Sequence, residues 1–149
     1  MSLSKFSPVM VTRKISLSGK TVTISTSATN NGSAVYTLKM RSHPEFAIPD
    51  KAKASCSFVD MNGNTINVPF TESEENKFFS GNNKPNGKWT VDLDDYSVTN
   101  LFDTKLVSQV LLNSTMTAKR YNLELYSTAI EIKPGETLTF TNSFEINVK

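Results

Sequence analysis

The sequence predicts an all-β protein, an antiparallel β-sandwich of about nine strands. Serine (18), threonine (17) and asparagine (14) make up about a third of the 149 residues, and strong helix formers such as alanine and leucine are sparse. Apolar and polar residues alternate with a period of two in several segments, which turn residues separate. Because internal repeats and alternating helical segments are absent from the sequence, we expect one sandwich domain over residues 1–149.

The first strands are predicted at residues 9–17 and 20–30, which are rich in valine, isoleucine and threonine. The Asn-Asn-Gly-Ser sequence at 30–33 tolerates positive φ, so it predicts a hairpin that leads into a third strand at 36–41. Pro44 should end that strand, because proline has no N–H to give to a strand ladder.

A second hairpin is predicted where Asn62-Gly63 separates strands at 55–60 and 65–70. Residues 71–88 are polar, charged and rich in asparagine, glycine and proline. We therefore predict one long surface loop there, of the kind that often carries binding residues, with a disordered connection as the alternative.

The C-terminal part contains the clearest alternation of the chain. From residue 138 to 148, Leu138, Phe140 and Phe144 share one face of a predicted strand with other apolar residues, and threonines occupy the opposite face. Residues 103–113 fit either a helical face or a buried strand, and their β-branched content favours a strand. Further strands are predicted at 89–93, 98–102 and 121–126, and a turn at 133–136.

Composition excludes several classes of protein. Cys56 is the only cysteine and His43 the only histidine, so the chain can form neither an internal disulfide nor a thiol zinc cluster, and we expect no metal and no cofactor. A net charge of +2 is far from the basic charge that nucleic-acid binding needs. No apolar run is long enough to span a membrane, so neither nucleic acid nor membrane is expected as a partner.

The N-terminus does not identify a compartment. The first 14 residues contain no continuous apolar stretch of the kind that a signal peptide has, and residues 1–8 include a candidate tag or linker. A truncated chain would leave a periplasmic or extracellular location open. The oligomeric state is not predicted.

His43 is the side chain best suited to chemistry. It lies in the sequence Arg41-Ser42-His43-Pro44-Glu45-Phe46, at a predicted strand end, and an imidazole, with an ordinary pKa of about 6.5, transfers protons near neutral pH. A histidine that only hydrogen-bonds a turn is the alternative. Trp89, the only tryptophan, follows the polar segment and is predicted either to stack on a sugar or to lie in the core.

Two motifs resemble the aldose 1-epimerase (galactose mutarotase) family. The first is a strand and an asparagine-containing turn, followed by a strand and His43-Pro44-Glu45-Phe46. The second is Asn122-Leu123-Glu124-Leu125, followed by a Pro-Gly-Glu turn at 134–136 and a final strand. The resemblance implies a galactose-mutarotase-like supersandwich and covers only the later half of the family's catalytic domain. It therefore implies that the chain is the C-terminal portion of a longer protein.

The resemblance also implies roles for individual residues. His43 corresponds to the general acid that protonates the sugar ring oxygen, and Glu124 to the general base that removes the anomeric hydroxyl proton. Arg41, Trp89 and Asp92 are predicted to bind the substrate. Asp92 is one of three candidates, with Asp94 and Asp95, for the family's substrate-binding aspartate.

The predicted function is that of a carbohydrate-associated domain that acts on or binds a free aldose, as an isomerase if it is catalytic. A noncatalytic carbohydrate-binding module that uses Trp89 and residues 71–88 is one alternative, and a structural or adhesive sandwich of a larger surface protein is another. The distance between the side chains of His43 and Glu124 separates these hypotheses, because an enzyme needs both on one concave surface.

Overall fold

The computed structural model describes residues 8–50 and 52–149, in which all strand pairs are antiparallel. The predicted all-β, antiparallel class is confirmed, with 14 strands in the described residues rather than about nine. The proposed tag or linker at residues 1–8 lies outside the described residues except for Pro8.

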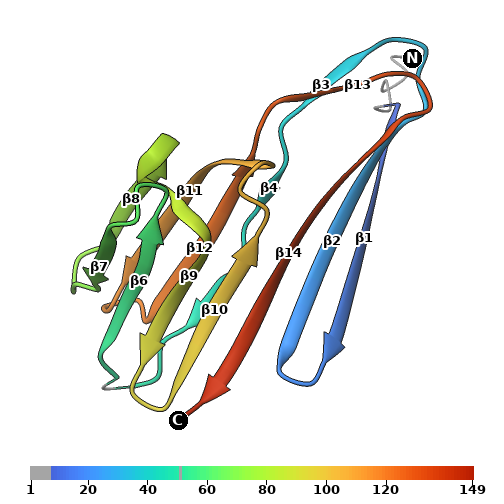
Figure 1. The fold of residues 1–149 in the computed structure, drawn as a ribbon. Coiled ribbons are helices and arrows are strands. Elements are labelled where there is room, and N and C mark those ends of the chain that lie inside the picture. Colours follow the sequence, from blue (N-terminus) through green and yellow to red (C-terminus); the bar gives the residue numbers. More distant parts are fainter. Residues whose placement is uncertain (1–7, 51) are drawn as a thin grey trace, which may run out of the picture.

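Most strands belong to two sheets that enclose one core (Figure 1). The seven-stranded sheet has the order β1-β2-β14-β10-β9-β6-β7. Its strands are β1 (Val9–Ser18), β2 (Thr21–Asn30), β14 (Thr137–Val148), β10 (Tyr96–Phe102), β9 (Pro85–Leu93), β6 (Ala54–Asp60) and β7 (Thr65–Pro69). The five-stranded sheet has the order β4-β12-β11-β8, with β5 also paired to β12. Its strands are β4 (Arg41–Ser42), β12 (Arg120–Ser127), β11 (Val107–Thr115), β8 (Glu75–Ser80) and β5 (Glu45–Ala47).

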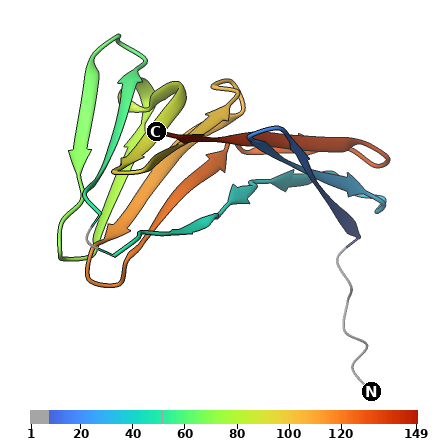
Figure 2. The same cartoon turned by 90° about the horizontal axis from the view of Figure 1, so that it is seen from below.

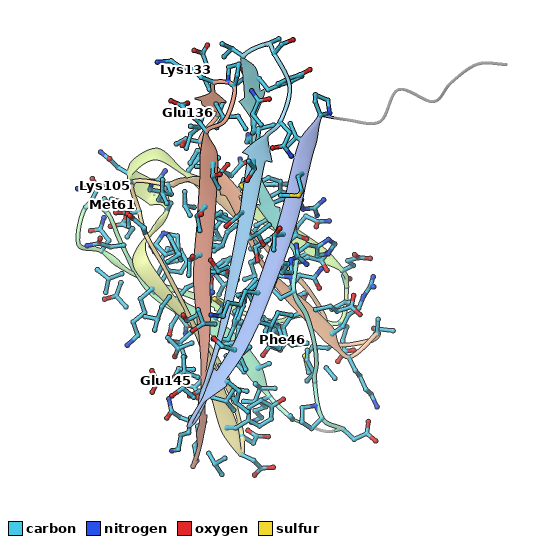
Figure 3. The ribbon with its side chains drawn as sticks, turned by 90° about the vertical axis from the view of Figure 1, so that its right-hand side faces the viewer. Phe46, Met61, Lys105, Lys133, Glu136 and Glu145 are labelled. Carbon is cyan, nitrogen blue, oxygen red and sulfur yellow. The ribbon has the colours of Figure 1, made fainter. Side chains whose placement is uncertain are left out.

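A third, two-stranded sheet of β3 (Tyr36–Leu38) and β13 (Ile130–Ile132) lies at one end of the molecule (Figure 1). Seen from below, β1, β2 and β14 extend to one side of the strands that form the sandwich body (Figure 2). The turn that holds Lys133 and Glu136 lies at one end of β14, and Glu145 lies near the other (Figure 3). No helix of the described residues is long and apolar enough to cross a membrane.

The hairpin at Asn62-Gly63 is confirmed, because β6 pairs with β7. The strands predicted at 9–17 and 20–30 are also confirmed as β1 and β2, which pair with each other. The long C-terminal strand is also confirmed, with Phe140 and Phe144 buried on the predicted apolar face. The ambiguous segment 103–113 contributes the strand β11, as the β-branched content favoured.

The predicted hairpin at 30–33 is wrong, because β2 pairs with β1 and β14 and does not pair with β3. The backbone of Asn30 exchanges hydrogen bonds with the turn before β14: its N–H donates to Glu136 O and its carbonyl accepts from Gly135 N. The Asn30 side chain donates to Ala34 O (2.7 Å) and to Ile132 O (3.0 Å). The turn therefore directs the chain to the small sheet instead of back along β2.

The long loop predicted at 71–88 is also wrong, since these residues include β8, a short 3₁₀ turn at Gly81–Asn83 and the start of β9. Strand β8 is at a sheet edge, where inward-pointing charged residues are tolerated. Lys77 and Glu75, two residues apart, pair at 2.7 Å, and these charges obscured the alternation in the sequence.

The core fills the space between the two large sheets. Trp89 has no exposed surface, and its Nε1 donates to Asn100 Oδ1 at 2.8 Å. Trp89 is therefore a core tryptophan, the second of the two alternatives for this residue. Cys56 is also buried, and burial raises the pKa of its thiol to about 12, so this cysteine is no candidate nucleophile.

Candidate functional site

The strand register places His43 beside Glu124. Strand β4 pairs Ser42 with Leu125 on β12, and β5 pairs Glu45 with Asn122 on the same strand. The two pairings share one register, so its continuation sets His43 opposite Glu124. Pro44 interrupts the ladder because it lacks an N–H, and this interruption separates β4 from β5.

An aromatic contact fixes the segment that carries His43. The ring of Phe46, on β5, stacks on Tyr121 of β12 with centroids 5.1 Å apart, and lies 5.3 Å from the Phe144 ring of β14. Phe46, three residues after His43, thus connects the two sheets. Because the short strands β4 and β5 make few backbone hydrogen bonds, this packing helps to hold His43 against β12.

Glu124 is a carboxylate with 2 % of its surface exposed, and donors surround it. Its Oε2 accepts from Arg41 Nε (2.7 Å) and Nη2 (2.5 Å) and from the Tyr126 hydroxyl (3.0 Å). Burial, together with this hydrogen bond to Glu124, raises the pKa of Tyr126, so the phenol remains a donor at neutral pH. The side chain of Glu124 is therefore held from the Oε2 side.

The second oxygen of Glu124 has longer contacts. Oε1 lies 3.2 Å from His43 Nε2 and 3.4 Å from Asn122 Nδ2. The side chain of His43 is 48 % exposed, so one side of the imidazole faces solvent. The site therefore combines a half-exposed imidazole with a buried carboxylate whose Oε1 makes only these longer contacts.

His43 Nε2 has two neighbours with opposite requirements. Asn122 Nδ2, which can only donate, is 2.5 Å away, whereas Glu124 Oε1, an acceptor, is 3.2 Å away. A neutral imidazole without a proton on Nε2 accepts from Asn122, and an imidazolium donates to Glu124. His43 Nε2 therefore lies between a donor, Asn122 Nδ2, and an acceptor, Glu124 Oε1.

A second group of charges adjoins the first on the same face. Arg120 Nη1 lies 3.3 Å from Glu45 Oε2, and Arg120 Nη2 lies 3.7 Å from Glu74 Oε1. Glu74 also accepts from Asn113 Nδ2 at 2.9 Å. The two groups border a polar cavity of about 240 Å³, with a lining that includes Arg41, His43, Asn113, Arg120, Asn122 and Glu124. This volume suits a ligand smaller than a typical drug molecule.

Three of the five predicted site residues come together here: Arg41, His43 and Glu124. Asp92 does not join them, because it lies on β9 of the other sheet and pairs with Lys149 at 2.6 Å. Trp89 is in the core and offers no exposed face to a sugar, so the stacking role predicted for it is wrong. Asp92 and Trp89 have no part in the cavity.

Sequence reasoning missed Asn122, Tyr126 and Arg120 as members of the site. The signal for all three was present, since they alternate with apolar residues on the strand that carries Glu124 and so share its face. What the sequence could not give was their contacts, which depend on the register between β12 and the strands β4 and β5.

Two other cavities among the described residues lack side chains suited to acid–base chemistry. One of about 420 Å³ lies over β6, β7 and β9, and another of about 460 Å³ lies beside Phe70 and Met116. Neither is lined by a histidine or a buried carboxylate. The residues that the structure describes also contain no group of three or more histidine, cysteine, aspartate or glutamate side chains that could hold a metal ion.

No protein-family model matches the chain, and no curated protein matches it in sequence. Solved structures do match it in fold. The Slr1438 protein of Synechocystis sp. PCC 6803 superposes with a TM-score of 0.77 at 13 % sequence identity, over 95 % of this chain and 55 % of that one.

Two further solved structures that match this chain are described as galactose mutarotase-like proteins. A galactose mutarotase-like protein of Lactobacillus casei matches with a TM-score of 0.70 at 12 % identity, over 94 % of this chain and 64 % of its own. A galactose mutarotase-like protein of Clostridium acetobutylicum matches with a TM-score of 0.64 at 15 % identity, over 92 % of this chain and 55 % of its own. The fold is galactose mutarotase-like.

The structural similarity confirms the fold that the two sequence motifs implied, and proteins named after aldose 1-epimerase are among the similar structures. The chain spans 55 % and 64 % of the lengths of these two galactose mutarotase-like proteins. At such low identity the likeness establishes the fold, whereas function depends on the site.

Proposed function

We propose that the chain is a carbohydrate-associated domain that binds a free aldose at the His43–Glu124 site and interconverts its anomers. The observation that carries this proposal is the 3.2 Å contact between His43 Nε2 and Glu124 Oε1 at the wall of a polar cavity. A general acid and a general base that can both reach one bound sugar are what the reaction needs. We also propose that the chain corresponds to the C-terminal portion of a longer protein.

In the proposed reaction, Glu124 accepts the proton of the anomeric hydroxyl while the bond between C1 and the ring oxygen breaks. The ring oxygen receives the electron pair of that bond and a proton from His43. Rotation about the C1–C2 bond of the open aldehyde, followed by the reverse steps, gives the other anomer. Neither a metal nor a cofactor takes part, and Arg41 and Tyr126 hold the carboxylate in place.

The environment of Glu124 supports this assignment. A sugar hydroxyl that displaces the 3.4 Å contact of Asn122 with Oε1 would leave the shorter bonds of Oε2 intact. The exposed imidazole edge is available to the ring oxygen of the same ligand. A purely structural sandwich would need none of these side chains to converge on a cavity.

Polarimetry of a freshly dissolved aldose tests the proposal. The 149-residue chain should accelerate the change in optical rotation, and His43→Gln and Glu124→Gln should each lower the catalysed rate by about a hundredfold or more. Glu145→Gln, on the outer face of the other sheet, is the matched control and should keep the wild-type rate.

The outcomes separate the competing functions. Equal rates for the wild type and both site variants would end the catalytic proposal. Calorimetric sugar binding without rate acceleration would instead indicate a noncatalytic binding domain. Absence of both would favour a structural or adhesive sandwich.

A further inference from the structure

Strand β1 is a free edge of the seven-stranded sheet. Residues 10–18 pair with β2 on one side and with no strand of the described residues on the other. In Figure 1 β1 is the outermost strand, and Figure 3 looks onto it from the open side. Such an edge presents backbone N–H and C=O groups that can pair with one more strand.

This edge lacks the features that usually protect a free strand. Proteins shorten an edge strand, or give it a proline, a bulge or an inward-pointing charge. At the opposite edge of the same sheet, β7 has only five residues and ends at Pro69. In contrast, β1 has ten residues, contains no proline and keeps an uninterrupted register with β2. The length and regularity of β1 are those of a strand suited to pairing.

The core-facing side of the sheet continues onto β1. Phe144 on β14 is buried in the core and is in register with Val22 on β2, which is in register with Leu17 on β1. Side chains in register share one face of a sheet. However, β1 and β2 extend to one side of the sandwich body (Figure 2), so Leu17 is 73 % exposed and Ile15, on the same face, 64 %. The free edge therefore carries an uncovered apolar stripe.

The charges of β1 restrict how a second copy of the chain can pair with it. A two-fold axis perpendicular to the sheet makes such a contact antiparallel, and an axis at Arg13 or at Lys14 would set that cation directly opposite its own copy. An axis at Ile15 avoids both, because Arg13 then lies opposite Leu17 of the second copy. In this register the two Lys14 Cα atoms are about 8 Å apart and the two Arg13 Cα atoms about 14 Å. Salt screens charges at such separations.

The outer face of β1 fits the same register. An axis at Ile15 sets Thr12 opposite Ser18 of the second copy. On the same face, hydroxyl side chains already pair across neighbouring strands, as Ser25 does with Thr141 at 2.9 Å. The second copy thus offers β1 a free edge, an apolar stripe and a hydroxyl partner at once.

We propose that two copies of the chain form a symmetric dimer through β1, with Ile15 at the two-fold axis. Their seven-stranded sheets then join into one continuous sheet. Backbone hydrogen bonds link the two β1 strands, and Ile15 and Leu17 of both copies pack together on the inner face. The dimer is independent of the proposed function, because His43 and Glu124 belong to the five-stranded sheet and its connections.

Sedimentation velocity over a range of concentrations tests the dimer. The wild-type chain should sediment as a dimer and dissociate on dilution, and added NaCl should not weaken the dimer because the contact joins like charges. Ile15→Lys places two cations face to face and should raise the dissociation constant at least about tenfold. Val59→Lys, which changes an exposed valine near the opposite edge of the sheet, is the matched control and should dimerise as the wild type does.

A cysteine cross-link tests the register. In the proposed dimer the two Ile15 Cα atoms are about 5 Å apart, within the range that a disulfide spans, so oxidised Ile15→Cys should run as a covalent dimer on a non-reducing gel. Val11→Cys is the matched control: Val11 is equally exposed, at 63 %, but its Cα lies about 27 Å from its own copy. Cys56 is buried, so the wild-type chain should not cross-link.

The outcomes are decisive for the dimer. A wild-type chain that stays monomeric at every concentration would overturn it. So would a dimer that Ile15→Lys, folded by circular dichroism, does not weaken, or one that NaCl dissociates, because such a dimer would use an acidic surface instead. Equal cross-linking of Val11→Cys and Ile15→Cys would also overturn it. None of these results would affect the proposed function.

Discussion

Two outer faces of the sandwich are polar, but they satisfy their polar groups in different ways. On β2 and β14, hydroxyl side chains pair across the strands: Ser25 with Thr141, and Ser27 with Thr139, both at 2.9 Å. These pairs are exposed, uncharged and complete in themselves. On β12, by contrast, Glu124 is buried and depends on side chains from a separate segment of chain, among them Arg41 and His43.

The difference shows which polar face is suited to chemistry. Exposed hydroxyls exchange partners with water at little cost, so a row of them stabilises a sheet face without a requirement for a ligand. A buried carboxylate is costly unless donors surround it, and Glu124 is surrounded by such donors at the wall of a cavity. Alternating polar residues alone do not distinguish the two faces, whereas burial and convergence do.

The largest expected effect of a change near the site is that of Phe46→Ala. Loss of the ring contacts with Tyr121 and Phe144 should lower the free energy of unfolding by about 3 kcal/mol, measured by urea denaturation. The segment that carries His43 should also become less well held, so protection of its amides from hydrogen exchange should fall. Phe46→Leu, which keeps much of the apolar volume, should lose less. An unchanged stability would show that Phe46 does not anchor this segment.

Arg41→Ala should have an intermediate effect. Removal of the guanidinium leaves buried Glu124 without its closest cation, and should lower the free energy of unfolding by about 2 kcal/mol. The matched control is Arg13→Ala on β1, whose exposed side chain makes a single 3.3 Å hydrogen bond to Thr26. If the two variants lose the same stability in urea, the distinction between the two faces is wrong.

The smallest effect is expected for the hydroxyl face. Replacement of the pair Ser25 and Thr141 by alanine and valine should change the free energy of unfolding by less than about 0.5 kcal/mol, because water already competes for these exposed groups. The same double variant should bind sugars as the wild type does. A large loss of stability, or of sugar binding, would show that this face does more than complete the sheet.

The elements that the sequence predicted well are those governed by local pattern. Alternation from 138 to 148 predicted β14, and Asn62-Gly63 predicted the hairpin of β6 and β7, because both signals act within a few residues. The turn at 30–33 carried an equally strong local signal, but long-range pairing of β2 with β14 determined its outcome. Local turn chemistry does not select the partner of the next strand.

The site shows the same division between local and distant information. His43 and Glu124 could be named from motifs, but only the shared register of β4 and β5 on β12 shows that they meet. Trp89 could have been assigned to the core, because Trp89, Val91 and Leu93 alternate with polar residues. Strand β8 could not be found from the sequence, since its charged residues concealed the alternation.

The most direct test uses the fact that His43 is the only histidine of the chain. Its imidazole resonances can be followed by NMR without ambiguity while a free aldose is added, with Glu124→Gln measured in parallel. We expect a saturable shift of the His43 signals in the wild type, and a weaker or absent response in the variant. Signals of His43 that stay unchanged up to saturating concentrations of every aldose tested would contradict the assignment of this site to sugars.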